Sequence, residues 1–211
     1  MGKLVIKNNV IGMVATNSYI VYDAEKKGAV LIDPAANGAF LLNQCRELGV
    51  TPEAVLLTHG HFDHIGGVED LVRAFPMPVY AGEKEAGLLS DPQMNLSIAY
   101  GVPMTVKNPQ LLRDGQELTL LGRTWKVMAT PGHTEGSVCY YVEKEKVLFS
   151  GDTLFHESYG RTDFPTGSGR SLRVSVTEKL FALPEDTAVY PGHEEETSIG
   201  HEKRYNPLAV Y

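Results

Sequence analysis

The chain has 211 residues, 43% of them hydrophobic, a size and composition typical of a globular protein with a substantial core. Its formal net charge is -7 and it has no basic run, which argues against nucleic-acid binding. It contains no apolar stretch of the about 18 residues that a membrane helix needs, and its N-terminus lacks the apolar segment of a signal peptide. Two cysteines, Cys45 and Cys139, are expected as buried free thiols, so we expect a cytoplasmic protein with neither a membrane nor a nucleic-acid partner.

The first half of the chain alternates strand and helix patterns. Two strands are expected over 17–23 and 28–34, joined by the polar turn 24–27. Apolar residues at helical spacing predict a helix over 38–50, closed by Gly49. A short strand (54–58), a helix stopped by Pro76 (67–75), a strand (78–82) and a helix (83–90) follow. Residues 91–115 are rich in turn formers and show no clear pattern.

The second half begins with four strands in succession, over 116–122, 124–130, 137–143 and 146–151. A helix with one apolar face is expected over 169–183, then a strand over 187–192 and a terminal helix over 196–205. No linker, repeat or charge run divides the chain. We therefore expect one α+β domain, residues 1–211, with two sheets and helices outside them.

Metal-type side chains crowd the loop LLTHGHFDHIGG, residues 56–67, where His59, His61, Asp63 and His64 fall within six residues. A hydrophobic core does not hold this many polar side chains, because burying them without hydrogen-bond partners costs several kcal/mol. Three further ligand types, His133, Asp152 and His193, follow apolar strands directly after a glycine, which lets the backbone turn sharply or approach closely. If these strands share a sheet edge, all seven groups meet there.

The inventory is five histidines and two aspartates, which is too many for one tetrahedral zinc ion. It suits two adjacent divalent metal ions, because a carboxylate can bridge a pair. Imidazole suits zinc, iron and nickel, and the carboxylates add tolerance for manganese or iron, so we expect zinc, with iron or manganese as alternatives. The remaining histidines, His156 and His201, are interpreted as ordinary residues without a ligand role.

The segments THGHFDH, PGHT, GDTLF and YPGHE resemble, in order, the motifs of the metallo-β-lactamase superfamily. The resemblance covers nearly the whole chain and implies a four-layer αββα sandwich with a metal centre at one edge. It also implies a division of the ligands between two metals. One metal would be held by His59, His61 and His133, the other by Asp63, His64 and His193, with Asp152 bridging them.

Within this superfamily the chain looks most like the short single-domain members of the glyoxalase II group, which hydrolyse S-D-lactoylglutathione to D-lactate and glutathione. The resemblance implies a small-molecule thioester substrate and a metal-bridging hydroxide that Asp63 orients and deprotonates as the catalytic residue. Arg161 and Tyr190 match substrate-contacting positions, although Arg161 could instead pair with Asp163 and Tyr190 could be a core aromatic. The C-terminal helical domain of long glyoxalases has no counterpart, so thioester hydrolysis is better supported than glutathione recognition.

Other activities on the same fold remain open. Persulfide dioxygenases also resemble this sequence and use one iron, which here would be held by His59, His133 and Asp152. A lactonase or phosphodiesterase would use the same metals with a different pocket. The best-known β-lactamases carry cysteine at the position of Asp152, which this chain does not. A metal-binding module without turnover is a further alternative, and no surface stripe indicates an oligomeric state.

Overall fold

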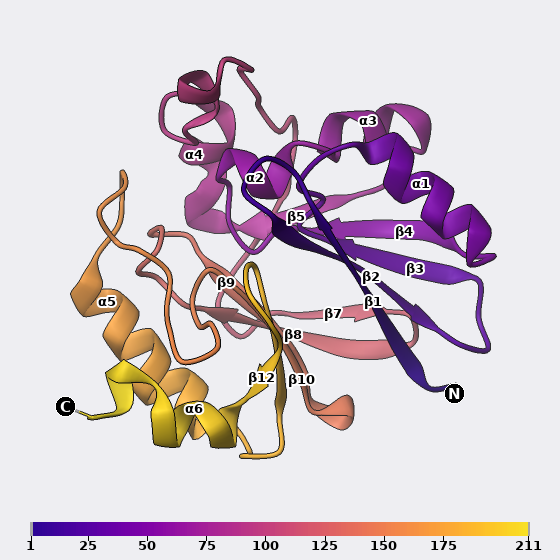
Figure 1. The fold of residues 1–211 in the computed structure, drawn as a ribbon. Helices are drawn as coiled ribbons and strands as arrows, with labels where there is room; N and C mark the ends of the chain where they lie inside the picture. The colour runs from indigo at the N-terminus through magenta and orange to yellow at the C-terminus, as the bar shows by residue number, and fades with distance from the viewer. Residues whose placement is uncertain (1, 211) are drawn as a thin grey trace.

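The computed structural model describes residues 2–210 as two six-stranded sheets packed face to face, with helices on both outer faces (Figure 1). The first sheet follows chain order: β1 (Leu4–Ile11), β2 (Thr16–Asp23), β3 (Gly28–Ile32), β4 (Thr51–Leu56), β5 (Val79–Gly82) and β6 (Gln110–Leu112). Strands β1 to β3 pair antiparallel and β3 to β6 pair parallel. Its parallel half therefore sends the carboxyl ends of several strands to one edge.

The second sheet has the order β12 (Thr197–Ser198), β11 (Ala188–Pro191), β10 (Val147–Gly151), β9 (Val138–Val142), β8 (Arg123–Ala129) and β7 (Glu117–Leu120). Its pairs are antiparallel except for β10 and β11, which run parallel. The parallel pair brings the carboxyl ends of β10 and β11 side by side. Two ligand-bearing loops leave from those ends.

Three apolar layers hold the elements together. Between the sheets, Trp125 and Phe149 are fully buried and stack with their ring centroids 5.8 Å apart. The outer layers pack α1 (Gly38–Glu47) and α3 (Val68–Ala74) on the first sheet, and α5 (Gly169–Val174) and α6 (Ile199–Tyr205) on the second. Each fully buried large side chain contributes roughly 1.5–3 kcal/mol from burial. The layer order confirms the predicted α+β, four-layer αββα sandwich.

Several local predictions need correction. Strand β1 was not predicted, because Lys7, Asn8 and Asn9 interrupt its apolar pattern and the strand lies at a sheet edge. The helix expected over 169–183 changes pitch: α5 gives way to a π-helical turn at Ser175–Lys179 and a 3-10 turn at Leu180–Ala182. The terminal helix begins at Ile199 rather than 196, since Thr197 and Ser198 pair with β11 as β12.

Smaller elements fill the segments between these. The predicted helix over 83–90 is a 3-10 turn, Glu83–Glu85, that continues into α4 (Ala86–Ser90). Residues 91–115 contain the 3-10 turn Ser97–Tyr100 and the short β6, and a last 3-10 turn spans Pro207–Val210. Both cysteines are buried free thiols, as expected. Over the described residues 2–210, none of the helices has the length and apolarity required to cross a bilayer.

Candidate metal centre

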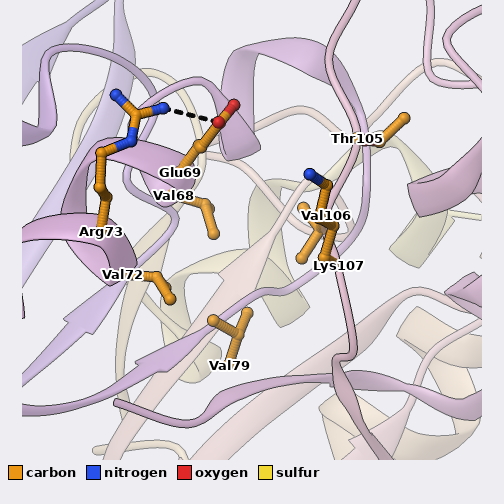
Figure 2. A pocket seen from close by; sticks show the side chains of 8 residues that line it. All are labelled: Val68, Glu69, Val72, Arg73, Val79, Thr105, Val106 and Lys107. Atoms are coloured by element: carbon orange, nitrogen blue, oxygen red, sulfur yellow. Dashed lines mark hydrogen bonds and ion pairs between the residues drawn. The ribbon is translucent and has the colours of Figure 1, made fainter. Parts of the chain in front are cut away.

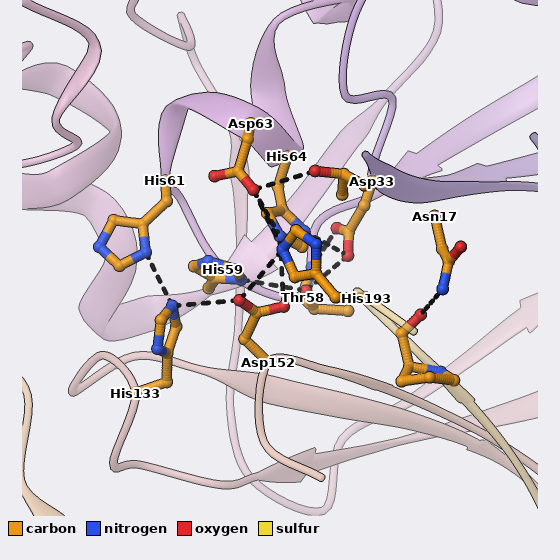
Figure 3. A network of polar contacts seen from close by, with 12 residues as sticks. Asn17, Asp33, Thr58, His59, His61, Asp63, His64, His133, Asp152 and His193 are labelled. Carbon is orange, nitrogen blue, oxygen red and sulfur yellow. Dashed lines mark hydrogen bonds and ion pairs between the residues drawn. The ribbon is translucent and has the colours of Figure 1, made fainter. Parts of the chain in front are cut away.

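Four strand ends deliver the predicted ligands to one edge of the sandwich (Figure 3). The loop after β4 carries His59, His61 and the short helix α2 (Phe62–Ile65), which contains Asp63 and His64. The loops after β8, β10 and β11 carry the remaining three: His133, Asp152 and His193. The seven groups therefore meet as expected, but the strands do not share one sheet: β4 belongs to the first sheet, and β8, β10 and β11 belong to the second.

Glycines permit the close approach of the ligand loops. Gly192 precedes His193, and a Cβ atom at Gly192 would lie 2.2 Å from Asp152 Oδ1 and 2.8 Å from His64 Cε1. Gly151 precedes Asp152 with φ +49°, and a Cβ there would lie 2.2 Å from the Thr58 hydroxyl oxygen. Any side chain at either position would push the cluster apart.

The ligand atoms lie at distances that suit metal coordination. Three groups of donors each lie within 4.8 Å of one another: His59, His61 and His133; His59, His64 and Asp152; and Asp63, His64 and His193. His61 Nδ1 is 2.8 Å from His133 Nε2, and His193 Nε2 is 3.2 Å from Asp63 Oδ2. Two ligands of a tetrahedral zinc ion lie about 3.3 Å apart, given zinc–ligand distances near 2.0 Å.

The carboxylate of Asp152 faces both groups of histidines. Its Oδ1 is 3.3 Å from His64 Nε2, and its Oδ2 is 3.5 Å from both His133 Nε2 and His193 Nε2. A carboxylate in this position can bridge two metal ions, as the sequence resemblance implies for Asp152.

Buried atoms without partners show that these residues fit a metal. His59 Nε2, His61 Nε2, His64 Nε2 and Asp152 Oδ1 are buried and make no hydrogen bond to any of the residues 2–210 that the structure describes. Leaving such atoms unsatisfied costs about 1–3 kcal/mol each. Bound cations would satisfy these atoms through their lone pairs.

The opposite ring nitrogens are held by the protein. His64 Nδ1 lies 2.9 Å from Asp33 Oδ2, and His133 Nδ1 lies 2.7 Å from the carbonyl oxygen of Arg161. In a neutral ring, both acceptors require the proton on Nδ1, which places the lone pair on Nε2. Metal-binding histidines are commonly oriented and made more basic in this way.

The electrostatic environment keeps two of the histidines and the central aspartate in the forms that bind metals. Burial, with His64 nearby, lowers the pKa of His59 well below its usual value, and burial beside His133 lowers the pKa of His61 to about 3. Burial alone would raise the pKa of Asp152, but the adjacent His64 reverses this, and the pKa lies below its usual value. Neutral imidazoles and an ionised carboxylate are the ligating species.

Negative charge gathers around His64. Burial works against a charged ring there, yet the carboxylates of Asp63, Asp152 and Asp33 raise the pKa of His64 well above its usual value. The cluster thus favours a positive charge at its centre, and divalent ions would supply it.

Sequence reasoning missed three supporting residues. Asp33 accepts from His64 and also from the Thr58 backbone N–H, at 2.8 Å, and the Thr58 hydroxyl, at 2.6 Å. The Thr16 hydroxyl donates to Asp63 Oδ2 at 3.0 Å. A signal for Asp33 was present, because it follows the apolar strand β3 just as the ligands follow theirs.

The third supporting residue, Glu85, connects two ligand loops. Its carboxylate is 1% exposed and accepts from the Gly60 backbone N–H, at 3.1 Å, between His59 and His61. It also accepts from the hydroxyl of Thr134, which follows His133, and from the Gly136 backbone N–H. Burial raises the pKa of Glu85 to about 7. Glu85 therefore fixes the spacing between the first and second ligand loops.

A pocket of about 410 Å³ opens beside the cluster. Five predicted ligands line it: His61, Asp63, His133, Asp152 and His193. The rest of its wall is mostly apolar and aromatic, formed by Val14, Phe62, Leu96, Tyr100, Phe155, Tyr159 and Phe164, with Ser158, Arg161 and Glu194. The size suits a small organic molecule whose polar reacting group meets the ligand atoms.

The two predicted substrate contacts lie in different surroundings. Arg161 lines this pocket, where it forms a two-pronged ion pair with Asp163, both distances being 2.7 Å, and covers the Phe164 ring at 3.9 Å. Tyr190 lies on β11 and packs against Phe149 and Tyr19, with ring centroids 5.4 and 5.7 Å away. It lines hollows outside the pocket that holds the ligands. The core interpretation of Tyr190 therefore fits the structure better than a substrate contact.

A separate hollow of about 220 Å³ lies beside α3 (Figure 2). Its lining residues are Val68, Glu69, Val72, Arg73, Val79, Thr105, Val106 and Lys107. The carboxylate of Glu69 is paired with Arg73 at 2.6 Å, and the remaining wall is largely valine. Among the described residues, none of the groups that could hold a metal includes a residue of this hollow, so the candidate site is the pocket with the histidines.

Known proteins share this sequence and fold. The sequence pattern of the metallo-beta-lactamase superfamily matches residues 11–193. The chain is 37% identical over 200 residues to the probable metallo-hydrolase YqgX of Bacillus subtilis, covering 94% of each protein. It is 33% identical over 195 residues to the hydroxyacylglutathione hydrolase GloC of Haemophilus influenzae, covering 91% of this chain and 92% of GloC.

Two solved structures superpose closely on the chain. The B3 metallo-beta-lactamase BLEG-1 has a TM-score of 0.93 and 42% identity, covering 98% of this chain and 100% of BLEG-1. The di-iron-bound form of TTHA1623 has a TM-score of 0.86 and 35% identity, covering 96% and 99% of the two chains.

Proposed function

The chain belongs to the metallo-β-lactamase superfamily and is a metallo-hydrolase, and we propose that it hydrolyses small thioesters of the S-D-lactoylglutathione type. The observation that carries this proposal is that five residues of the seven-ligand cluster line one open pocket. The identity to GloC supports a thioester substrate.

We propose the two-metal division of ligands, with Asp152 between the two sets. Bound divalent ions would supply a hydroxide at neutral pH and would polarise the substrate carbonyl. The imidazole-rich ligand set suits zinc, with iron or manganese as alternatives, and the di-iron form of TTHA1623 supports iron as one of them.

The chain's own residues would position the reactants. Asp63 faces the pocket, is held by the Thr16 hydroxyl and can orient the attacking oxygen and accept its proton. The leaving thiolate needs no dedicated acid, because ordinary thiols have a pKa near 8.5. Arg161 stands at the pocket wall, and its exposed pair with Asp163 can exchange for a carboxylate on the thiol carrier.

The test is a thioester panel assayed with the metal-loaded protein. S-D-lactoylglutathione is compared with lactoyl thioesters of neutral thiols. Hydrolysis of the panel, lost on chelation and restored by metal, supports the proposal. A fully loaded protein that hydrolyses no thioester contradicts it, and oxygen consumption with glutathione persulfide would then favour the single-iron alternative.

A second candidate is β-lactam hydrolysis, favoured by the 42% identity to BLEG-1 over nearly the whole chain. The same pocket and ligands would serve an amide carbonyl in place of a thioester. A chromogenic cephalosporin assayed beside the thioesters decides between the two: the preferred substrate is the one with the higher kcat/KM.

A further inference from the structure

A second group of histidines and carboxylates lies outside the candidate metal centre. His156 follows Phe155 in the loop after Asp152, and His201 lies in the first turn of α6. Their rings stack at 22° with centroids 4.8 Å apart. Both rings approach the same atom, Glu157 Oε1, which is 3.0 Å from His201 Nε2 and 3.9 Å from His156 Nε2. Neither histidine belongs to the seven-residue cluster.

The spacing of these atoms resembles that of metal ligands. The two distances, 3.0 and 3.9 Å, bracket the about 3.3 Å that separates two ligands of a tetrahedral zinc ion. Donor atoms of His156, His201 and Glu202 also lie within 4.8 Å of one another. A small movement of the partly exposed His156 side chain would complete a two-nitrogen, one-oxygen set. The carboxylates of Glu202 or Glu195, or water, would provide the remaining position.

The scaffold under this group is rigid. The side chain of Glu202 is fully buried and accepts from the Glu157 backbone N–H at 3.0 Å, from Asn206 Nδ2 at 2.8 Å and from the Thr197 hydroxyl at 2.6 Å. Asn206 Nδ2 also donates to the Ser158 carbonyl oxygen at 2.9 Å. The loop carrying His156 and Glu157 is thereby fastened to α6, which carries His201. The ligand side chains are therefore brought together without a metal, which lowers the entropic cost of binding one.

Two independent surface ion pairs would not explain why both histidine rings approach the same oxygen of Glu157. Each histidine could have paired with its own carboxylate, and His156 Nδ1 does lie 3.2 Å from Glu195 Oε1. Instead, two rings from separate segments also share one oxygen of Glu157. Two imidazoles and a carboxylate are a donor set that zinc and neighbouring first-row metals prefer.

We propose that His156, His201 and Glu157 bind one divalent transition-metal ion, of which zinc is the best match, at a peripheral site separate from the seven-residue cluster. The site joins the loop after Asp152 to α6. Phe155, Ser158 and Tyr159, which flank the two loop ligands, line the candidate substrate pocket. A metal at the peripheral site fastens one wall of that pocket to the helix behind it.

The test is a zinc titration of the holoprotein, with its central cluster already filled, followed by equilibrium dialysis and metal analysis. The wild-type chain should take up one further zinc ion, and its Tm should rise as that ion binds. His201→Gln and His156→Gln should take up none at the concentration that saturates the wild type. Anomalous scattering from zinc-soaked crystals should place the added ion between these two side chains.

Further variants separate loss of the site from loss of the fold. Glu157→Gln keeps the shape of the side chain and should weaken uptake of the further ion at least tenfold. Glu185→Gln is the matched control, since it removes an exposed carboxylate that pairs with Arg204 of α6 but lies outside the group. All variants must retain the metal content of the central cluster. No further ion in the wild type, or unchanged uptake in both histidine variants, would overturn the proposal.

Discussion

The two histidine clusters of this chain differ in burial and in what satisfies their ring nitrogens. In the central cluster, His59 and His64 are at most 1% exposed, and their Nε2 atoms make no hydrogen bond within residues 2–210, although His64 Nε2 lies 3.3 Å from the Asp152 carboxylate. In the peripheral group, the side chains of His156 and His201 are about one third exposed and face carboxylates. The central cluster therefore depends on metal to offset its desolvated donors, whereas the peripheral group is satisfied without one and should bind metal more weakly and exchange it faster.

Substitution of a central ligand should have the largest effect. We expect His61→Ala to lower the metal content of the central cluster and to reduce thioester hydrolysis by more than about 100-fold, because loss of a direct ligand exceeds the 10–100-fold cost of losing a residue that supports one. Metal analysis and steady-state kinetics measure both. The matched change His156→Ala should leave the metal content of the central cluster unaltered. Equal losses of central metal and of hydrolysis in the two variants would contradict the separation of the two clusters.

Removing the support behind a ligand should cost less. Asp33→Asn keeps the size of the side chain but weakens its hold on His64 Nδ1 and on Thr58. We expect metal affinity to fall about 10–100-fold, measured by competition with a chromogenic chelator. Asp70→Asn, an exposed change on α3, serves as the control. Unchanged affinity in Asp33→Asn would show that Asp33 does not orient His64.

Glu85 should affect the pH dependence of stability. Its pKa is about 7 when folded against an ordinary value of 4.5, so the folded chain keeps a proton that the unfolded chain has lost. The free energy of unfolding should therefore fall by up to about 3 kcal/mol as pH rises from 4.5 to 7, and stay level above that range. Denaturant unfolding of wild type and Glu85→Gln isolates this contribution, because the variant lacks the titrating group. Equal pH slopes in the two proteins would contradict it.

The smallest effect is expected at the pocket wall. Arg161→Ala should raise KM for glutathione thioesters about tenfold with little change in kcat, because the guanidinium would contact the thiol carrier rather than the reacting carbonyl. Thioesters of neutral thiols should be affected less, which is the internal control. If Arg161→Ala leaves KM unchanged for both substrate types, Arg161 does not contact the substrate and only pairs with Asp163.

The central ligands were predictable because His133, Asp152 and His193 each follow an apolar strand and a glycine, and because His59 to His64 lie together in the sequence. Residues that act only through tertiary contact were not. Asp33 reaches His64 across 31 positions and Glu85 reaches Gly60 across 25, and the sequence around neither residue shows which group the carboxylate contacts. The contact between His156 and His201 was not predictable for the same reason, since the two rings meet only when α6 packs beside the loop after Asp152.

The sheets were predicted where strands were locally apolar, as at β4, β9 and β10. Strand β1 was missed because its polar centre is tolerated only through pairing with β2. The apolar spacing of residues 169–183 does not reveal the π-helical turn after α5, because the same side of the segment faces the sheet before and after the change of pitch. Tertiary packing, rather than local propensity, decides both.

The most direct test of the account is metal analysis and thioester hydrolysis measured on the same purified preparation, with the peripheral group disabled by His201→Gln. The account predicts two divalent ions per chain and hydrolysis of S-D-lactoylglutathione that disappears on chelation and returns on reloading. One ion per chain with no thioester hydrolysis after full reloading would contradict it.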